Sequence, residues 1–196
     1  MTDKTDDIRR RFEDSARVTR QTGELLAGRI AQAAQLITDC YRRGVGVLLF
    51  GNGGSAADAQ HIAGELVGRF LKERRALKAQ ALSTDTSVLT AIGNDYHFED
   101  VFVRQLEACG SAGDVAIGLS TSGNSANVVA ALRRARQLGL KTIALTGEGG
   151  GRCAELADVL LDVPEKLTPR VQEAQMVAYH VLCELIEAAI VADGAA

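Results

Sequence analysis

A glycine-rich turn and a histidine–glutamate pair stand close together in the stretch LLFGNGGSAADAQHIAGE, residues 48–65. Glycines let a ligand approach the backbone, and the first amide groups of a helix that follows them would point at an anion. We place Ser55 at the N-cap of that helix, where its hydroxyl adds a donor. His61 and Glu65 are four residues apart, a spacing that puts both on one helix face. The stretch therefore combines an anion cradle with two groups that can bind a metal or move a proton.

A second loop with similar chemistry is STSGNS, residues 120–125, which also follows an apolar run and precedes a helical segment. Its hydroxyls belong to Ser120, Thr121, Ser122 and Ser125. A phosphate monoester needs several donors and is stabilised by a helix N-terminus. The alternative for one such loop is an ordinary Ser/Thr-rich turn that caps a helix. Because two loops of this kind occur at expected strand ends, we favour a phosphorylated metabolite as the ligand.

The first loop also matches G-x-G-x-x-A at Gly51, Gly53 and Ala56, which raises the possibility of a dinucleotide site. The acidic partner for the ribose should follow about 20 residues later, and Asp85 comes late for that role. No Gly-Lys-Ser/Thr sequence follows the glycines, which excludes a P-loop. We therefore disfavour a nucleotide cofactor.

A helical segment near the C-terminus contributes Gln172 and His180, which are eight residues, or a little over two turns, apart. With His61 and Glu65 they could form a site of two nitrogen and two oxygen ligands, which zinc accepts. A glutamine amide is an uncommon ligand, so the spacing alone does not name the metal. The structural alternatives are a surface His–Glu pair and a histidine that only packs within its helix.

Apolar runs alternate with helical segments and must position these groups. A helical pattern runs from about residue 5 to 43 and ends at Gly44. Five strands are predicted at 45–50, 76–82, 114–120, 141–147 and 158–164. Further helices are predicted at 56–70, from 88 to about 94, and at 125–139, 153–157 and 168–192. This alternation predicts a three-layer α/β sandwich with a parallel sheet, whose ligands bind beyond the carboxyl ends of the strands. The loop at 146–151 lies at the same edge as the other two.

The length of 196 residues suits a single domain, in which residues 1–44 form a helical segment and residues 45–196 the sheet with its covering helices. A net charge of −3 and the absence of tryptophan argue against nucleic acid as a partner. The charged N-terminus is not a secretory signal, and no apolar run approaches the roughly 20 residues that span a bilayer. Four cysteines without a CxxC pair indicate reduced, buried thiols. We expect a cytoplasmic protein without a membrane partner.

Four segments resemble the phosphoheptose isomerase family of sugar isomerase (SIS) domains: GNGGSAADAQHIAGEL (51–66), TAIGNDY (90–96), GLSTSGNSANV (118–128) and VQE…H (171–180). The resemblance covers nearly the whole chain. It implies a flavodoxin-like, five-stranded parallel sheet with an extra N-terminal helix for oligomer packing. It also implies a homotetramer with active sites at subunit interfaces and one zinc ion, Zn²⁺, in each site. The activity implied is the interconversion of sedoheptulose 7-phosphate and D-glycero-D-manno-heptose 7-phosphate through an enediol(ate), in heptose biosynthesis.

The resemblance also assigns roles to individual residues. It implies that the metal ligands are His61, Glu65, Gln172 and His180, and that Glu65 and His180 are the acid/base pair. The substrate contacts that it implies are Asn52, Gly53, Gly54, Ser55, Glu65, Asn94, Asp95, Ser120, Thr121, Ser122, Ser125 and Gln172. One departure is Gln175, where many relatives carry a further histidine. We expect the four ligands to suffice for metal binding, although this change can lower activity or metal affinity.

Two other functions are compatible with the same fold. Replication-initiation regulators share both phosphate-type loops and form tetramers that bind the initiator protein, but they do not keep an acid and a histidine at the positions of Glu65 and His180. A sugar-phosphate sensor would keep the loops and would need no Glu65. Because both residues are present here, the enzyme is favoured.

Overall fold

The computed structural model of the chain describes residues 3–194 and contains one five-stranded parallel sheet in the order β2-β1-β3-β4-β5. The strands are β1 (Val47–Gly51), β2 (Ala79–Ala81), β3 (Val115–Ser120), β4 (Lys141–Thr146) and β5 (Val159–Asp162). Apolar runs with both faces buried explain why β1 and β3 lie in the middle of the sheet. The predicted flavodoxin-like topology is confirmed.

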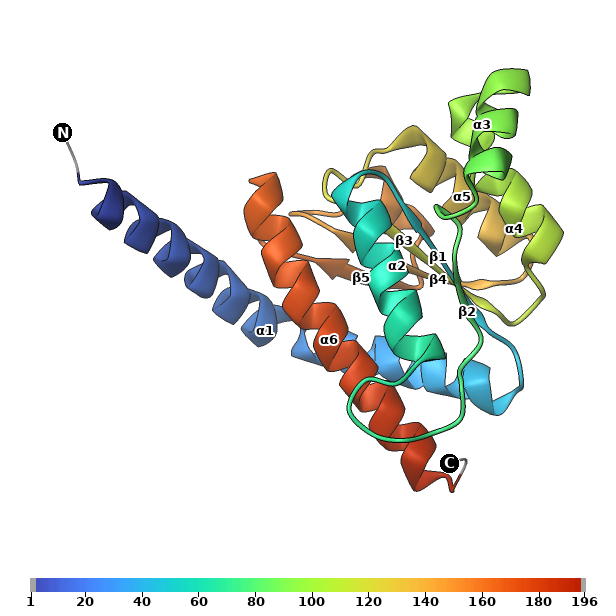
Figure 1. Cartoon of the computed structure of the whole chain (residues 1–196), viewed down its shortest axis with the longest axis horizontal. Coiled ribbons are helices and arrows are strands. Elements are labelled where there is room, and N and C mark those ends of the chain that lie inside the picture. The colour runs from blue at the N-terminus through green and yellow to red at the C-terminus, as the bar shows by residue number, and fades with distance from the viewer. Residues whose placement is uncertain (1–2, 195–196) are drawn as a thin grey trace.

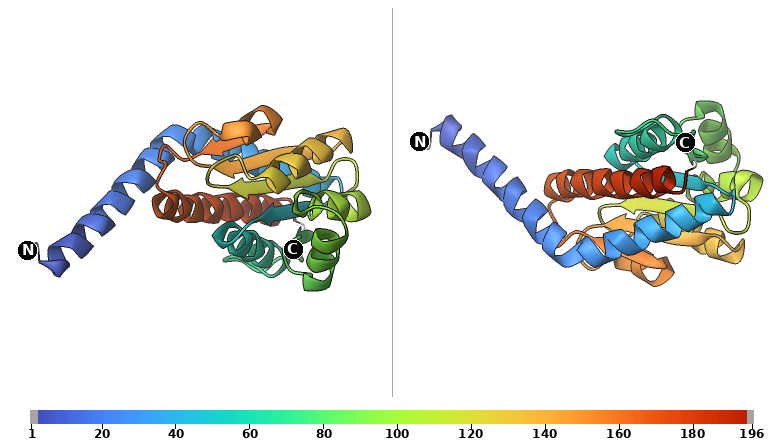
Figure 2. Two further views of the ribbon diagram at one scale, coloured as in Figure 1. Left: turned by 90° about the horizontal axis from the view of Figure 1, so that it is seen from above. Right: turned by 90° about the horizontal axis from the view of Figure 1, so that it is seen from below.

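Helices cover both faces of the sheet and complete the three layers (Figure 1). One face packs against α1 (Lys4–Arg42), α2 (Gly54–Val67) and α6 (Thr168–Ala192). The other face packs against α3 (Thr86–Asp95), α4 (Val103–Cys109) and α5 (Ala126–Gln137). Figure 2 shows that the N-terminal part of α1 extends well beyond this body, while its C-terminal part lies along the sheet.

The strand register brings the two predicted phosphate-type loops to one edge. Gly51 of β1 pairs with Leu119 of β3, and Ser120 pairs with Thr146 of β4. Because the strands are parallel, the loops that follow them open on the same side of the sheet. The prediction that both loops lie at the carboxyl edge of the sheet is confirmed.

Several local predictions need correction. Gly53, not Ser55, is the N-cap of α2, and its φ of +56° is a conformation that glycine adopts easily. Ser55 instead lies buried in the first turn. The helix α4 and the 3₁₀ helix η1 (Phe98–Asp100) were missed, because segments of seven and three residues are too short to show a helical period. The predicted helix at 153–157 is a 3₁₀ helix, η2 (Gly151–Leu156).

The cysteines are all free, as expected, but they are not all buried. Cys40, Cys153 and Cys183 are buried, and burial raises the pKa of the Cys40 and Cys153 thiols to about 11 and that of Cys183 to about 12. Cys109 is exposed at the end of α4, so the prediction is wrong for this residue. The error follows from missing the helix that carries it.

By length and composition alone, α6 could cross a membrane, so the statement that no apolar run is long enough was wrong. Half of its most apolar window is buried inside the fold, as in the core helix of a folded domain. It packs along α1 and α2 over the sheet (Figure 1). Its apolar character is therefore weak evidence for a membrane span.

Candidate active site

A pair of amide side chains joins the first loop to the first turn of α5, which directly follows the second loop. Asn52 Nδ2 donates to Asn127 Oδ1 at 2.9 Å, and Asn127 Nδ2 donates back to Asn52 Oδ1 at 2.8 Å. A Cβ on Gly51 would lie 2.9 Å from the carbonyl oxygen of Leu119, which is closer than side-chain carbons come in proteins. The glycine therefore permits the close approach of the two strand ends, and the loops form one continuous cradle.

Three of the four predicted hydroxyls in the second loop converge. Ser120 Oγ lies 3.0 Å from Ser125 Oγ and 3.4 Å from Ser122 Oγ. Ser125 is the N-cap of α5, and its side chain forms no capping hydrogen bond, so the positive end of this helix faces the cluster. Thr121 is tied in differently, because its carbonyl accepts from Gly147 N at 2.9 Å. Neutral donors at a helix N-terminus are suited to a phosphate group.

The third loop, residues 146–151, and the first residues of η2 that follow it support the second loop. Cys153 N donates to Gly123 O at 2.9 Å, and Arg152 N donates to Asn124 Oδ1 at 3.0 Å. Gly123 has a φ of +65°, and a Cβ on it would collide with the backbone of Gly150. These contacts hold the backbone of the second loop, and with it the hydroxyl cluster, in place.

Three predicted residues meet where α2 runs beside α6. His61 Nε2 lies 3.1 Å from Glu65 Oε1 and 3.4 Å from His180 Nε2, and one potential ligand atom from each residue lies within 4.8 Å of the others. The Phe70 ring packs at a tilt on His180, with ring centroids 5.6 Å apart. Two imidazole nitrogens and a carboxylate oxygen are ligands that zinc accepts, so the donor set fits a divalent metal.

Two further residues contact this cluster and were not singled out from the sequence. The Tyr179 hydroxyl lies 3.1 Å from His61 Nδ1 and 3.2 Å from Asp58 Oδ1. Burial raises the pKa of Tyr179, with the charge of Asp58 adding to the effect, and burial also raises the pKa of Asp58. Asp58 lies one turn before His61, a helical spacing that could have drawn attention to it.

The other predicted residues lie apart from the cluster. The amide of Gln172 lies over Gly54, at the start of α2, so that a Cβ on Gly54 would collide with it. Asn94 and Asp95 are exposed at the end of α3, where Asn94 Nδ2 donates to Asp95 Oδ1 at 2.7 Å. Gln175 is buried, and its amide atoms have no hydrogen-bond partner among the described residues. Asp85 caps α3 by accepting from Val88 N at 2.9 Å, which gives it a structural role.

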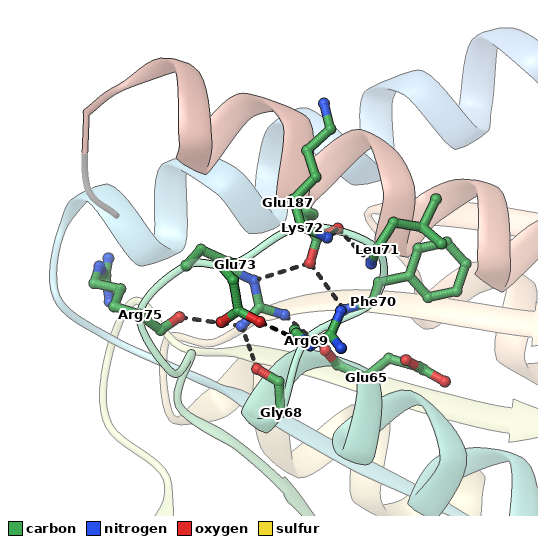
Figure 3. Close-up of polar contacts among 10 residues, drawn as sticks. Glu65, Gly68, Arg69, Phe70, Leu71, Lys72, Glu73, Arg75 and Glu187 are labelled. Carbon is green, nitrogen blue, oxygen red and sulfur yellow. Dashed lines mark hydrogen bonds and ion pairs between the residues drawn. The ribbon is translucent and has the colours of Figure 1, made fainter.

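A buried ion pair fixes the loop between α2 and β2 beside the cluster (Figure 3). Glu187 of α6 accepts from the backbone nitrogens of Phe70, Leu71 and Lys72 at 2.7–2.8 Å. Arg74 lies 3.4 Å from Glu187 and donates to the Glu65 carbonyl at 2.7 Å. Burial raises the pKa of Glu187, but these donors and Arg74 hold it below its ordinary value. The pair therefore connects the end of α2, which carries Glu65, to the helix that carries His180.

The fold and the cradle define a class of protein. A family model described as a SIS domain matches residues 11–147, which is more than half of the chain. This match includes both glycine- and serine-rich loops and the helix that carries His61 and Glu65.

Individual relatives give a finer assignment. The chain is 55% identical over 180 residues to the phosphoheptose isomerase of Aquifex aeolicus, covering 92% of this chain and 94% of the relative. The structure of phosphoheptose isomerase GmhA from Neisseria gonorrhoeae has a TM-score of 0.89 at 44% identity, covering 95% of this chain and 100% of that one. A phosphoheptose isomerase structure from Francisella tularensis has a TM-score of 0.91 at 36% identity, covering 95% and 99%. The chain therefore belongs to the SIS domain family, and within it to the phosphoheptose isomerases.

Proposed function

We propose that this enzyme interconverts sedoheptulose 7-phosphate and D-glycero-D-manno-heptose 7-phosphate in heptose biosynthesis. The observation that carries the proposal is the position of the His61–Glu65–His180 cluster on the helix that begins at the glycine cradle. His61 and Glu65 lie about 11 and 17 Å along α2 from Gly54 at the usual helical rise. A phosphorylated sugar bound at the helix start can extend along the helix toward these groups.

The phosphate end of the substrate is assigned to the two loops. Asn52, Gly53, Gly54 and Ser55 supply the first part of the cradle, and Ser120, Thr121, Ser122 and Ser125 supply the second. The described hydroxyls of Ser120, Ser122 and Ser125 already converge, so they need little rearrangement to donate to one anion. Gln172, which lies over Gly54, is placed to contact the bound sugar.

The reaction moves a proton between C1 and C2 of the sugar, and we assign this to Glu65 and His180. Glu65 takes the proton from one carbon, the electron pair forms the enediol(ate) double bond, and the same proton is returned to the neighbouring carbon. His180 exchanges the proton that must move between the two sugar oxygens. Phe70 packs on the His180 ring and limits its rotation.

A metal, zinc in this proposal, would be held by His61, Glu65 and His180. Gln172 lies over Gly54, apart from these three side chains, so it would complete the ligand set only after a rearrangement. When bound, it would polarise the sugar carbonyl and stabilise negative charge on the sugar oxygens. A carboxylate that is tightly bound to zinc is a poor base, so Glu65 cannot perform both roles in a single geometry. His61 is then the residue with a purely ligating role.

The assembly that we propose is a homotetramer in the cytoplasm, with active sites at subunit interfaces. Asn94 and Asp95 are exposed and lie on the face opposite α2 and α6, so they would complete a site only through a neighbouring subunit or a movement of α3. The exposed apolar side chains Met176, Val177, Val181 and Leu185 on α6 provide a surface for such packing.

Incubation with sedoheptulose 7-phosphate in heavy water tests the proposed reaction. We expect the aldose product. It should carry deuterium at C2 in those turnovers in which the transferred proton exchanges with solvent. The Glu65→Gln variant should bind the sugar phosphate but lose at least about 100-fold in kcat, because it removes the base. Full activity of this variant would refute the assignment of Glu65, and no aldose from the unaltered protein would refute the enzymatic function.

The alternatives are a regulator that binds the replication initiator and a sugar-phosphate sensor. Both retain the cradle without turnover, so binding of the heptose phosphate without product would favour the sensor. The close approach of Glu65, His61 and His180 favours the enzyme, because simple phosphate recognition needs none of these three groups.

A further inference from the structure

The Tyr179 hydroxyl lies between two polar groups of α2. Tyr179 itself is fully buried on α6, and its oxygen is 3.2 Å from Asp58 Oδ1 and 3.1 Å from His61 Nδ1. Asp58 and His61 are three residues apart and share a helix face. The three side chains therefore form a row that ends at the ring of His61.

The number of protons shared by the three side chains determines which group donates and which accepts in each hydrogen bond. A tyrosine has one hydroxyl proton, and an ionised carboxylate can only accept. The hydrogen bond that the structure gives to the Asp58 side chain comes from Tyr179, so the hydroxyl proton points to Asp58. The Tyr179 oxygen must then accept from His61, which requires a proton on Nδ1.

A neutral imidazole carries one proton, so a proton on Nδ1 leaves Nε2 of His61 bare. That atom lies 3.1 Å from Glu65 Oε1 and 3.4 Å from His180 Nε2. A bare nitrogen and a carboxylate oxygen at this distance repel each other unless a cation lies between them. The opposite tautomer would bond Glu65 but would take the hydroxyl proton away from the half-buried Asp58.

We propose that Asp58 and Tyr179 act as positioning residues that hold His61 in the Nδ1–H tautomer and leave its Nε2 free to bind a divalent metal. Outer groups that orient a metal-binding histidine in this way usually change metal affinity when they are removed. The part of this inference that concerns metal binding rests on the proposed function. The part that concerns the tautomer does not, because the tautomer exists in the metal-free protein as well.

Nitrogen-15 NMR of the histidine rings in the metal-free protein at alkaline pH tests the hydrogen-bonded row of Asp58, Tyr179 and His61. The chain has three histidines, and exposed His97 serves as an internal reference. We expect the Nδ1–H form for His61 in the unaltered protein and a shift toward the Nε2–H form in Tyr179→Phe. Asp58→Asn should cause a shift in the same direction, since a neutral amide no longer requires the hydroxyl proton.

Zinc binding by competition with a chromophoric chelator supplies the second readout. Tyr179→Phe should weaken zinc binding by about 10- to 100-fold. The matched control is Tyr41→Phe, which removes another buried hydroxyl, one without a hydrogen-bond partner among the described residues. It should leave both the tautomer and the zinc affinity unchanged.

Two results would overturn the proposal: an unaltered His61 tautomer in Tyr179→Phe, or equal zinc affinity in this variant and the original protein. An equal loss of affinity in Tyr41→Phe would also overturn it, because the effect would then be a general consequence of removing a buried hydroxyl. If the unaltered protein binds no zinc, the metal assignment in the proposed function is wrong. The tautomer comparison then still tests whether Asp58 and Tyr179 position His61.

Discussion

At the scale of single residues, the site depends on glycines that permit close approach as much as on groups that react. Gly51 lets β1 approach the end of β3, and Gly123 lets the second loop pack against the backbone of Gly150. Both make a contact that a Cβ would prevent, and neither has a reactive group. Reactive residues such as Glu65 can act on a bound sugar only if these contacts hold the cradle in place.

Gly123→Ala tests this point, with Gly149→Ala as the matched control. Both glycines have positive φ, +65° and +76°, so an alanine at either is strained by about 1–2 kcal/mol. Only at Gly123 would the new Cβ collide with backbone, at Gly150, which should add about 1–3 kcal/mol of destabilisation. Urea denaturation measures both, and the substrate KM should rise for Gly123→Ala. Equal unfolding free energies of the two variants would show that the loop contact contributes nothing.

At the scale of elements, the buried pair of Arg74 and Glu187 connects α2, the following loop and α6. Both side chains are almost completely buried, with 1% and 3% of their surface exposed. A buried charge that loses its partner is costly, whereas an exposed pair contributes little. The pair therefore fixes the relative position of the helices that carry Glu65 and His180.

Glu187→Gln should destabilise the fold by about 3 kcal/mol, because Arg74 loses its counter-charge. Glu73→Gln is the control, since Glu73 pairs with Arg69 at 3.0 Å on the surface, and it should cost less than about 0.5 kcal/mol. Urea denaturation at neutral pH compares the two. A similar small loss in both variants would contradict a role for the buried pair.

The same comparison has a defined pH dependence. The pKa of Glu187 lies below its ordinary value in the folded state, so its contribution is complete above the ordinary value and is lost as pH falls through the folded one. The difference in unfolding free energy between the original protein and Glu187→Gln should therefore shrink on acidification. A difference that stays constant down to acid pH would contradict the lowered pKa.

At the scale of the whole molecule, the long helices leave an apolar surface uncovered in the single chain. A groove of about 300 Å³ lies between α1 and α6 and includes Thr22, Ile30, Val177, Val181 and Leu185. Several α6 side chains on this surface are more than two-fifths exposed, although α6 is the most extensively packed partner of α1. Apolar surfaces of this kind mark protein–protein contacts, which supports the proposed tetramer.

Leu185→Glu should therefore shift the assembly toward smaller species, because a carboxylate would be buried without a partner and every 1.4 kcal/mol of cost weakens association about tenfold. Light scattering coupled to size exclusion measures the mass. Leu167→Glu is the control, since Leu167 is also an exposed leucine, 59% against 41% for Leu185, but lies outside the groove. An unchanged mass for Leu185→Glu would exclude this groove from the interface.

The sequence by itself determined the fold class and part of the site. Continuous apolar runs between helical segments were enough to predict five parallel strands, and the helical spacing of His61 and Glu65 was enough to place them on one face. The long C-terminal helix was predicted with its correct bounds, Thr168–Ala192. These features depend on local periodicity, which a single sequence contains.

Only the tertiary structure decided which distant groups meet. Tyr179 reaches Asp58 and His61 across 118 or more positions of the chain, and Glu187 reaches the loop at 70–72 across a similar separation. Such contacts depend on how α2 and α6 cross the sheet, and no local pattern encodes that. The start of α2 was also decided outside the local capping pattern, because Gly53 with its positive φ is the N-cap and Ser55 is buried in the first turn. The roles predicted for Gln172, Asn94 and Asp95 stay predictions, because they depend on a bound substrate and on neighbouring subunits.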